Sequence, residues 1–374
     1  MKYIRTYDTE ERFLADKDDN SRGFRLKPVL YKYSEAGDHI HLETDDPRKY
    51  RDEGSTYMEI TLDSDVVFSF YIGNASDNTE TTMDCRVDWG DGTVDESLSI
   101  VADSNGFKLS HSYKAGSYSI ELHKVARDYS IIGNPENYKS LISHPSSVKN
   151  VILGEGNNYG VGGVVSIGLK AFLSCTSLTS IHIPDGVTSI DTDAFSECTS
   201  LTSIYIPEGV TSIGKDAFRS CRSLTSVYIP EGVTSIGEQA FYNCHSLTSA
   251  YIPSGVTIIK GTFRSCESLT SVYIPESVTS IGGSAFSGCT GLTSVNIPEG
   301  VTKILNYAFD GCTSLISISS LNTTAPTLGQ FDSGQYTIFT DLPANGTLHI
   351  KPGATGYDVW LYYLPEGWRI VEDL

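Results

Sequence analysis

The sequence lacks any apolar run as long as a membrane span, and its first twenty residues, MKYIRTYDTEERFLADKDDN, contain no hydrophobic segment that could direct secretion. We therefore expect no membrane insertion. Two alternatives remain open for export. Either a secretion signal is missing from this sequence, or the protein reaches its site without one.

Positive charge is also scarce, because 27 Lys and Arg stand against 46 Asp and Glu and give a formal net charge of −19. No basic stripe offsets this balance locally, and such an acidic surface repels phosphate backbones. We therefore expect no nucleic-acid partner. The chain of 374 residues has no low-complexity tract and is long enough for two or three folded units.

Recognisable catalytic motifs are missing as well. The sequence contains no His-Glu-x-x-His motif, no nucleophile elbow and no convincing Ser/His/Asp set. The segment GVTSIGKD (209–216) is one letter from a phosphate-binding loop, but its sister GVTSIGEQ (232–239) identifies it as the turn of a repeat. We predict a protein that is not an enzyme, with no catalytic residues, no cofactor and no metal ligands. Calcium at Asp88, Asp91 and Asp95 is the alternative that remains open.

Clustered cysteines, typical of disulfide frameworks and metal sites, are absent too. Seven of the eight cysteines follow one another at intervals of 23 residues, with a single interval of 22. Equal spacing indicates one structural position that is repeated, so we expect a column of small buried thiols. These seven are Cys175, Cys198, Cys221, Cys244, Cys266, Cys289 and Cys312.

Alignment on these cysteines reveals a 23-residue unit, IxxxAFxxCxSLTSIxIPxGVTS. Self-similarity at such a period predicts a stacked solenoid. Its LTSIxI segment predicts a strand with the LxxLxL core of a leucine-rich repeat, and its AFxxC segment predicts a short helical turn. The predicted fold class is mainly β: a β-sandwich followed by a capped leucine-rich-repeat solenoid with short helical turns on the convex side.

The repeat unit resembles the BspA-type leucine-rich repeat of bacterial surface proteins, especially those of gut and oral Bacteroidetes, over residues 146–374. This resemblance implies surface display, adhesion and binding of host or matrix proteins. Upstream, VDWGDGTV (87–94) and SHSYKAGSYSIEL (110–122) resemble the polycystic-kidney-disease-type (PKD-type) β-sandwich. In surface proteins that module implies a spacer or stalk.

These features divide the chain into five predicted segments. They are a polar N-terminal arm or linker (1–56), a PKD-like β-sandwich (57–135), an N-terminal cap or degenerate repeat (136–166), seven leucine-rich repeats of 22–23 residues (167–321) and a C-terminal cap (322–374).

The variable position between the two isoleucines of IxI is the most informative for binding. Strand side chains alternate, so this position faces outward while its neighbours face the core. We call it the outer row, and it consists of His182, Tyr205, Tyr228, Tyr251, Tyr273 and Asn296. The position after the proline forms a second row, the acid row, which consists of Asp185, Glu208, Glu231, Ser254, Glu276 and Glu299.

Exposed aromatic rows are favoured contact surfaces, so the outer row is the candidate ligand-binding site. The alternative is that stacked tyrosines merely suit a β surface and that the acids keep the edge soluble. We predict a non-enzymatic, surface-displayed binding or adhesion protein that recognises a host or matrix protein, or a glycan, through the sheet face. It would lie at the cell surface if a signal is missing. The alternative is a structural or receptor-binding virion component of a phage that infects such bacteria. The oligomeric state stays open.

Overall fold

The computed structural model describes residues 31–33, 40–42, 56–74, 82–101, 107–123, 129–131, 142, 145–153, 164–329 and 338–374. The chain divides into two compact units, Met1–Glu53 and Gly54–Leu374. In the first unit, β1 (Tyr31–Tyr33) and β2 (Ile40–Leu42) form an antiparallel pair. Most of the predicted arm, and residues 136–141, 143–144 and 154–163 of the predicted N-terminal cap, lie outside the described residues.

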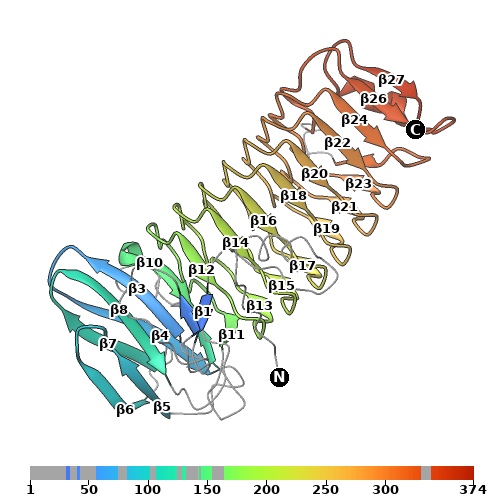
Figure 1. The fold of residues 1–374 in the computed structure, drawn as a ribbon. Helices are drawn as coiled ribbons and strands as arrows, with labels where there is room; N and C mark the ends of the chain where they lie inside the picture. The colour runs from blue at the N-terminus through green and yellow to red at the C-terminus, as the bar shows by residue number, and fades with distance from the viewer. Residues whose placement is uncertain are drawn as a thin grey trace. The chain divides into compact units, whose positions relative to one another are not determined.

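The second unit begins with antiparallel strands in two sheets, and both sheets continue into the repeats (Figure 1). Strand β10 pairs antiparallel with β3 and parallel with β12, while β9 pairs antiparallel with β4 and parallel with β11. The N-terminal strands therefore satisfy the backbone edges that the first coil would otherwise expose. These strands are β3 (Thr56–Leu62), β4 (Val66–Asn74), β5 (Thr82–Asp88), β6 (Val94–Val101), β7 (Phe107–Tyr113), β8 (Gly116–His123), β9 (Tyr129–Ile131) and β10 (Val148–Ile152).

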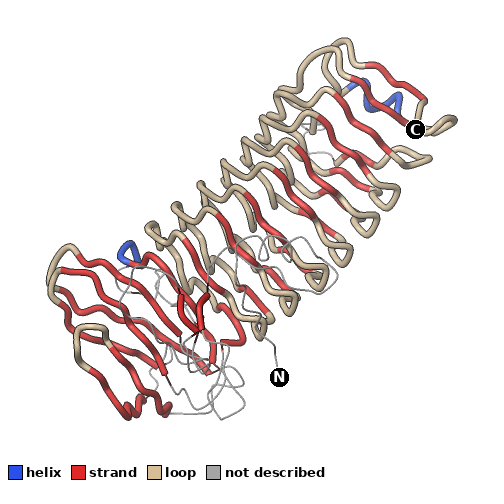
Figure 2. Tube along the Cα trace, viewed as in Figure 1, coloured by secondary structure: helices blue, strands red, loops and turns tan. Residues whose placement is uncertain are grey.

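The repeats form a β-solenoid, which with its flanking coils makes about nine turns, and the chain is mainly β. Each coil gives one strand to each of two parallel sides (Figures 1 and 2). The first side holds β12 (Ser180–His182), β14 (Ser203–Tyr205), β16 (Ser226–Tyr228), β18 (Ser249–Tyr251), β20 (Ser271–Tyr273), β22 (Ser294–Ile297), β24 (Ser317–Ser320), β26 (Thr347–Ile350) and β27 (Arg369–Glu372). The second holds β11 (Val164–Ile167), β13 (Ser189–Ile190), β15 (Ser212–Ile213), β17 (Ser235–Ile236), β19 (Ile258–Ile259), β21 (Ser280–Ile281), β23 (Lys303–Ile304) and β25 (Thr327–Leu328).

The prediction of short helical turns in the repeats is wrong, because the AFxxC segments form hydrogen-bonded turns (Figure 2). Each turn holds two residues at positive φ four positions apart, such as Asp193 (φ 55°) and Glu197 (φ 63°). Left-handed residues interrupt a right-handed helix. The amides then alternate in direction: Ala194 N donates to Asp191 O within the coil, whereas Phe195 N donates to Ala217 O of the next coil. The turns thus join neighbouring coils, which amides bonded inside an α-helix could not do.

Helices in the described part of the chain are two short 3-10 segments, η2 (Pro145–Ser147) and η3 (Tyr357–Tyr362). No helix within the described ranges is both long and apolar enough to cross a membrane.

The predicted thiol column is confirmed, since all seven repeat cysteines are free and buried. Each thiol from the second unit onward donates to a phenylalanine carbonyl of the preceding coil, as Cys198 Sγ does to Phe172 O at 3.1 Å. Burial raises the pKa of Cys221 and Cys266 to about 12. The thiols are therefore small core groups held in the protonated state.

A ladder of stacked phenyl rings runs beside the thiols. Successive centroids are 5.2–6.2 Å apart and successive ring planes differ by 4–11°. The ladder consists of Phe172, Phe195, Phe218, Phe241, Phe263, Phe286, Phe309 and Phe339. Trp360 then lies 5.5 Å from Phe339 with its plane tilted by 45°. The tilt ends the ladder, because it offers no parallel face to a further ring.

We expect Phe218→Ala to lower the free energy of unfolding by about 3–5 kcal/mol, the range for emptying a packed aromatic site. Phe218 is fully buried and stacked on both sides, on Phe195 and Phe241. Guanidinium unfolding followed by circular dichroism measures the loss. Ile258→Ala is the matched control, since its side chain is 55% exposed in the same solenoid, and we expect a change within about 0.5 kcal/mol. Equal losses in the two variants would contradict the role of the ladder.

Candidate functional site

The structure places the outer row on the first side of the solenoid, with its side chains pointing outward. The isoleucines that flank Tyr205, Ile204 and Ile206, are buried. In-register parallel pairing sets Tyr205 beside Tyr228 and Tyr251 beside Tyr273. The row therefore forms because each coil repeats the same register.

Exposure divides the outer row. Tyr251 and Tyr273 are 38% and 54% exposed, whereas Tyr205 and Tyr228 are half-buried. His182 and Asn296, at the two ends of the row, are exposed. Hence the most accessible aromatic surface lies toward the C-terminal end of the row.

Tyr251 and Tyr273 form a stacked pair, with centroids 5.2 Å apart and planes 7° apart. The hydroxyl of Tyr251 donates to Glu231 of the preceding coil. Glu231 Oε2 also accepts from the backbone N of Ser254 at 3.2 Å and from its Oγ at 3.0 Å. The bond to Glu231 raises the pKa of Tyr251 to about 12, and the bond from Tyr251 lowers the pKa of Glu231.

Sequence reasoning missed this link between the two rows. It grouped Ser254 with the exposed acids, whereas the structure uses it as a donor that holds Glu231. The signal that was available is the single neutral residue in a row of carboxylates. Other acids of the row also have protein partners: Glu299 Oε2 lies 3.1 Å from Lys351 Nζ, and Glu276 Oε2 accepts from Gly300 N at 3.3 Å.

A second aromatic cluster lies on the turns, where sequence reasoning had placed nothing. The guanidinium carbons of Arg219 and Arg264 are 5.7 and 5.5 Å from the ring centroid of Tyr242. These are cation–π distances, and the two arginines come from the coils on either side of Tyr242. Tyr242 consequently has a cation against its ring from each neighbouring coil.

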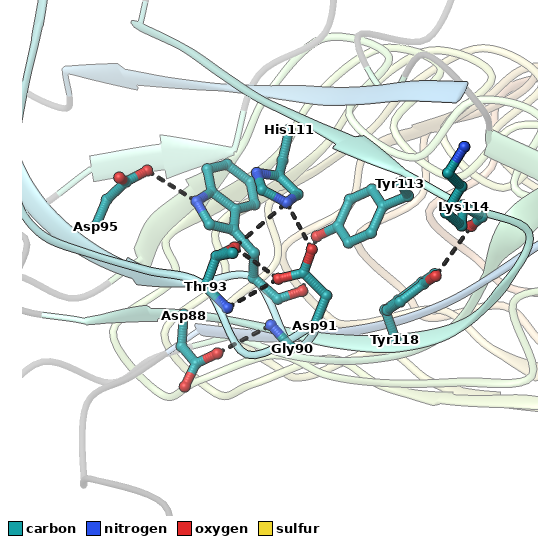
Figure 3. A network of polar contacts seen from close by, with 10 residues as sticks. Asp88, Gly90, Asp91, Thr93, Asp95, His111, Tyr113, Lys114 and Tyr118 are labelled. Carbon is teal, nitrogen blue, oxygen red and sulfur yellow. Dashed lines mark hydrogen bonds and ion pairs between the residues drawn. The ribbon is translucent and has the colours of Figure 1, made fainter. Parts of the chain in front are cut away.

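The WGDG segment builds a polar network around a buried tryptophan (Figure 3). Asp91 Oδ1 accepts from Thr93 N at 3.0 Å and Thr93 Oγ1 at 2.6 Å, and its Oδ2 lies 2.8 Å from His111 Nε2. Trp89 stacks on His111 at 4.9 Å, and the hydroxyl of Tyr113 donates to Trp89 O at 2.8 Å. The GDG turn and the HxY segment thus meet at one tryptophan.

The three carboxylates considered for calcium serve different protein donors. Asp88 Oδ1 accepts from Gly90 N at 2.9 Å, and Asp95 Oδ2 accepts from Trp89 Nε1 at 2.8 Å. Asp91 is held by Thr93 and His111 as described. Within the described residues, no group of three or more His, Cys, Asp or Glu side chains is arranged to hold a metal ion. The bonds of this network organise the turn and the tryptophan.

The repeats match a known family model. Residues 162–261 and 257–333 match the BspA type leucine rich repeat region, in six copies. These residues are BspA-type leucine-rich repeats, and they form a β-solenoid. No curated protein matches the chain in sequence.

Solved structures of bacterial repeat proteins resemble this chain. The leucine rich repeat protein TpLRR of T. pallidum is 26% identical over 64% of this chain and 100% of its own, with a TM-score of 0.41. A leucine rich cell surface protein of Faecalibacterium prausnitzii is 28% identical over 58% of this chain and 63% of its own, with a TM-score of 0.37. A leucine-rich repeat protein of Bacteroides ovatus is 17% identical over 93% of this chain and 100% of its own, with a TM-score of 0.28.

Asp91 should make the stability of the N-terminal sheets depend on pH. Burial by itself raises the pKa of Asp91, but hydrogen bonds from Thr93 and His111 outweigh it and hold the pKa at about 2. A carboxyl whose folded pKa lies below its unfolded value of about 3.9 stabilises the fold above that value. That contribution is lost as the pH falls from about 4 through about 2.

We therefore expect the melting temperature of Asp91→Asn to lie below that of the wild type at pH 6, and the difference to shrink as the pH falls from 4 to 2. Thermal unfolding of the full chain, followed by tryptophan fluorescence, measures it. Asp63→Asn, at an exposed position between β3 and β4, is the control for removing a carboxylate outside this network. A difference between Asp91→Asn and wild type that stays constant from pH 6 to pH 2 would contradict the assignment.

Proposed function

We propose that this chain is a non-enzymatic binding protein that recognises a host or matrix protein, or a glycan, through the outer row. The observation that carries the proposal is the exposed, parallel stack of Tyr251 and Tyr273. Tyrosines are enriched in recognition surfaces because they offer large contact areas with few rotatable bonds.

The strands that carry the outer row pack on a rigid core, and a rigid surface favours recognition. Its strands stand on a core of stacked phenyl rings and buried thiols, and Tyr251 is further held by Glu231. A surface fixed before the partner arrives loses little conformational entropy on binding. The remaining members of the proposed site are His182, Tyr205, Tyr228 and Asn296.

Surface display belongs to the same proposal, and the BspA-type repeats support it because their resemblance implies display and adhesion. We also propose the five-segment organisation, with residues 57–135 as a PKD-type module. The pairing of β3 with β10 and of β9 with β11 supports a second role for that module, as a cover for the first coil.

Replacing Tyr228 and Tyr251 together by serine should weaken partner binding at least about tenfold, a loss of about 1.4 kcal/mol, while the melting temperature stays nearly unchanged. Both side chains face outward from the solenoid, so their removal takes away contact surface rather than core packing. Surface plasmon resonance on an immobilised extracellular-matrix preparation measures the binding. Val359→Ser with Tyr362→Ser is the matched control, because both side chains are exposed, at 48% and 84%, and lie in the C-terminal cap. Undiminished binding in the outer-row variant would sink the proposal.

Protease shaving of intact source cells should release repeat peptides, identified by mass spectrometry, because a displayed solenoid is accessible to protease. Lysate and released particles are the comparison samples. Peptides found only in the lysate would contradict surface display, and peptides found in particles would favour the virion component.

A further inference from the structure

The orientation of the stacked tyrosines decides which aromatic surface a ligand can reach. Neighbouring parallel strands lie about 4.8 Å apart, and the ring centroids of Tyr251 and Tyr273 lie 5.2 Å apart with planes 7° apart. The ring normals therefore run along the stacking direction of the coils. Tyr273 covers one face of Tyr251, and the edges of both rings, rather than their faces, point outward.

Only at the end of such a stack is a ring face left open. The face of Tyr273 turned away from Tyr251 looks toward β22, the next strand on this side, where Asn296 takes the outer-row position. An asparagine side chain ends at about the level where a tyrosine ring begins, so it cannot cover that ring. The exposures agree, since Tyr273 is 54% exposed and Tyr251 is 38% exposed.

The hydroxyl of Tyr273 also differs from that of Tyr251 in its hydrogen bonding. Tyr251 is held by the acid-row residue of the preceding coil, Glu231. The equivalent residue for Tyr273 is Ser254, whose hydroxyl is bonded to Glu231 instead. Among the described residues no hydrogen bond from the Tyr273 hydroxyl is formed, so that hydroxyl remains available to a ligand. Two departures from the repeat, Ser254 and Asn296, thus fall on either side of one ring.

The surroundings of this ring are polar and carry negative rather than positive charge. Asn296 offers an exposed amide with a donor and an acceptor, and Ser271 and Ser294 are exposed beside it. Glu276 belongs to the coil of Tyr273, and the chain as a whole carries −19. An anionic ligand would be repelled, whereas a neutral ligand with many hydroxyls would find hydrogen-bond partners.

We infer that the open face of Tyr273, with Asn296 beside it, is a subsite for a neutral pyranose ring. The electron-rich face of an aromatic ring attracts the C–H bonds on the apolar side of a sugar, while the Asn296 amide and the Tyr273 hydroxyl bond to sugar hydroxyls. Protein hot spots cluster in well-packed, desolvated pockets, whereas this single ring face lies among exposed polar side chains. The inference rests on the proposed function, and it narrows the ligand to a neutral glycan at one end of the outer row.

The test is binding of the full chain to an array of neutral and sialylated glycans, followed by titration calorimetry with the best neutral oligosaccharide on the array. Tyr273→Ser removes the open face, and Asn296→Tyr covers it by extending the stack with a residue that four other coils already carry at this position. Tyr362→Ser is the matched control, because it removes a tyrosine that is 84% exposed and lies outside the outer row. Melting curves establish that each variant is folded.

We expect a neutral glycan to be retained, with affinity falling at least about tenfold in both Tyr273→Ser and Asn296→Tyr and by less than about twofold in Tyr362→Ser. An equal loss in Tyr362→Ser would overturn the subsite. Retention of sialylated glycans alone, or of no glycan, would also overturn the subsite. Matrix binding that still depends on Tyr228 and Tyr251 would then show that the proposed function survives without it. A neutral glycan retained equally by every variant would overturn both.

Discussion

The in-register stacking of identical coils is the constraint on which the rest of this structure depends. Every phenyl ring of the ladder stacks on the ring at the equivalent position of a neighbouring coil, and the turn amides, such as that of Phe195, need a carbonyl in the next coil. A shift of one residue would turn the inward isoleucines outward and break both sets of contacts. The outer row follows from this constraint, because a register that aligns the core also aligns whatever side chains face away from it.

The fifth repeat shows how strictly the register is kept. It has one residue fewer between Ile259 and Phe263, yet Phe263 still stacks on Phe241 at 5.6 Å. The missing residue is absorbed ahead of the turn, where Gly261 takes the left-handed position at φ 58°. Thr262, fully buried, occupies the place that alanine holds in the other repeats, and its hydroxyl accepts from Lys260 N at 3.2 Å. The length of the segment between the strand and the turn can therefore change, whereas the position of the phenyl ring in the ladder is kept.

The repeat period of the sequence predicts which positions are buried and which face outward, but it does not predict the backbone conformation of the turns or the contacts between distant residues. Equal spacing was sufficient for the thiol column, and alternation was sufficient for the outward position of Tyr251. The prediction of a helical turn was wrong because alanine and cysteine four residues apart suit an α-helix as well as they suit the turn that forms. The positive φ of Asp193 and Glu197 has no sequence signature when glycine is absent. The bond from Tyr251 to Glu231 joins residues 20 positions apart, and the continuity of β3 with β10 joins residues still farther apart. The residue pattern within one repeat unit predicts neither the hydrogen bond nor the strand pairing.

A solenoid of this kind separates the residues that hold it together from those available to a partner. Because each core position is repeated, stability is spread over many nearest-neighbour contacts, and outward residues can differ from coil to coil at little cost. The departures from the consensus are therefore the positions where a specific surface can arise. Ser254 and Asn296 are such departures, and each changes the surroundings of the one exposed ring between them. Ser254 and Asn296 distinguish Tyr273 from Tyr251, whose hydroxyl is bonded to Glu231 and whose ring is covered on one face by Tyr273. The irregularity, rather than the repetition, thus creates a surface that a small ligand can distinguish.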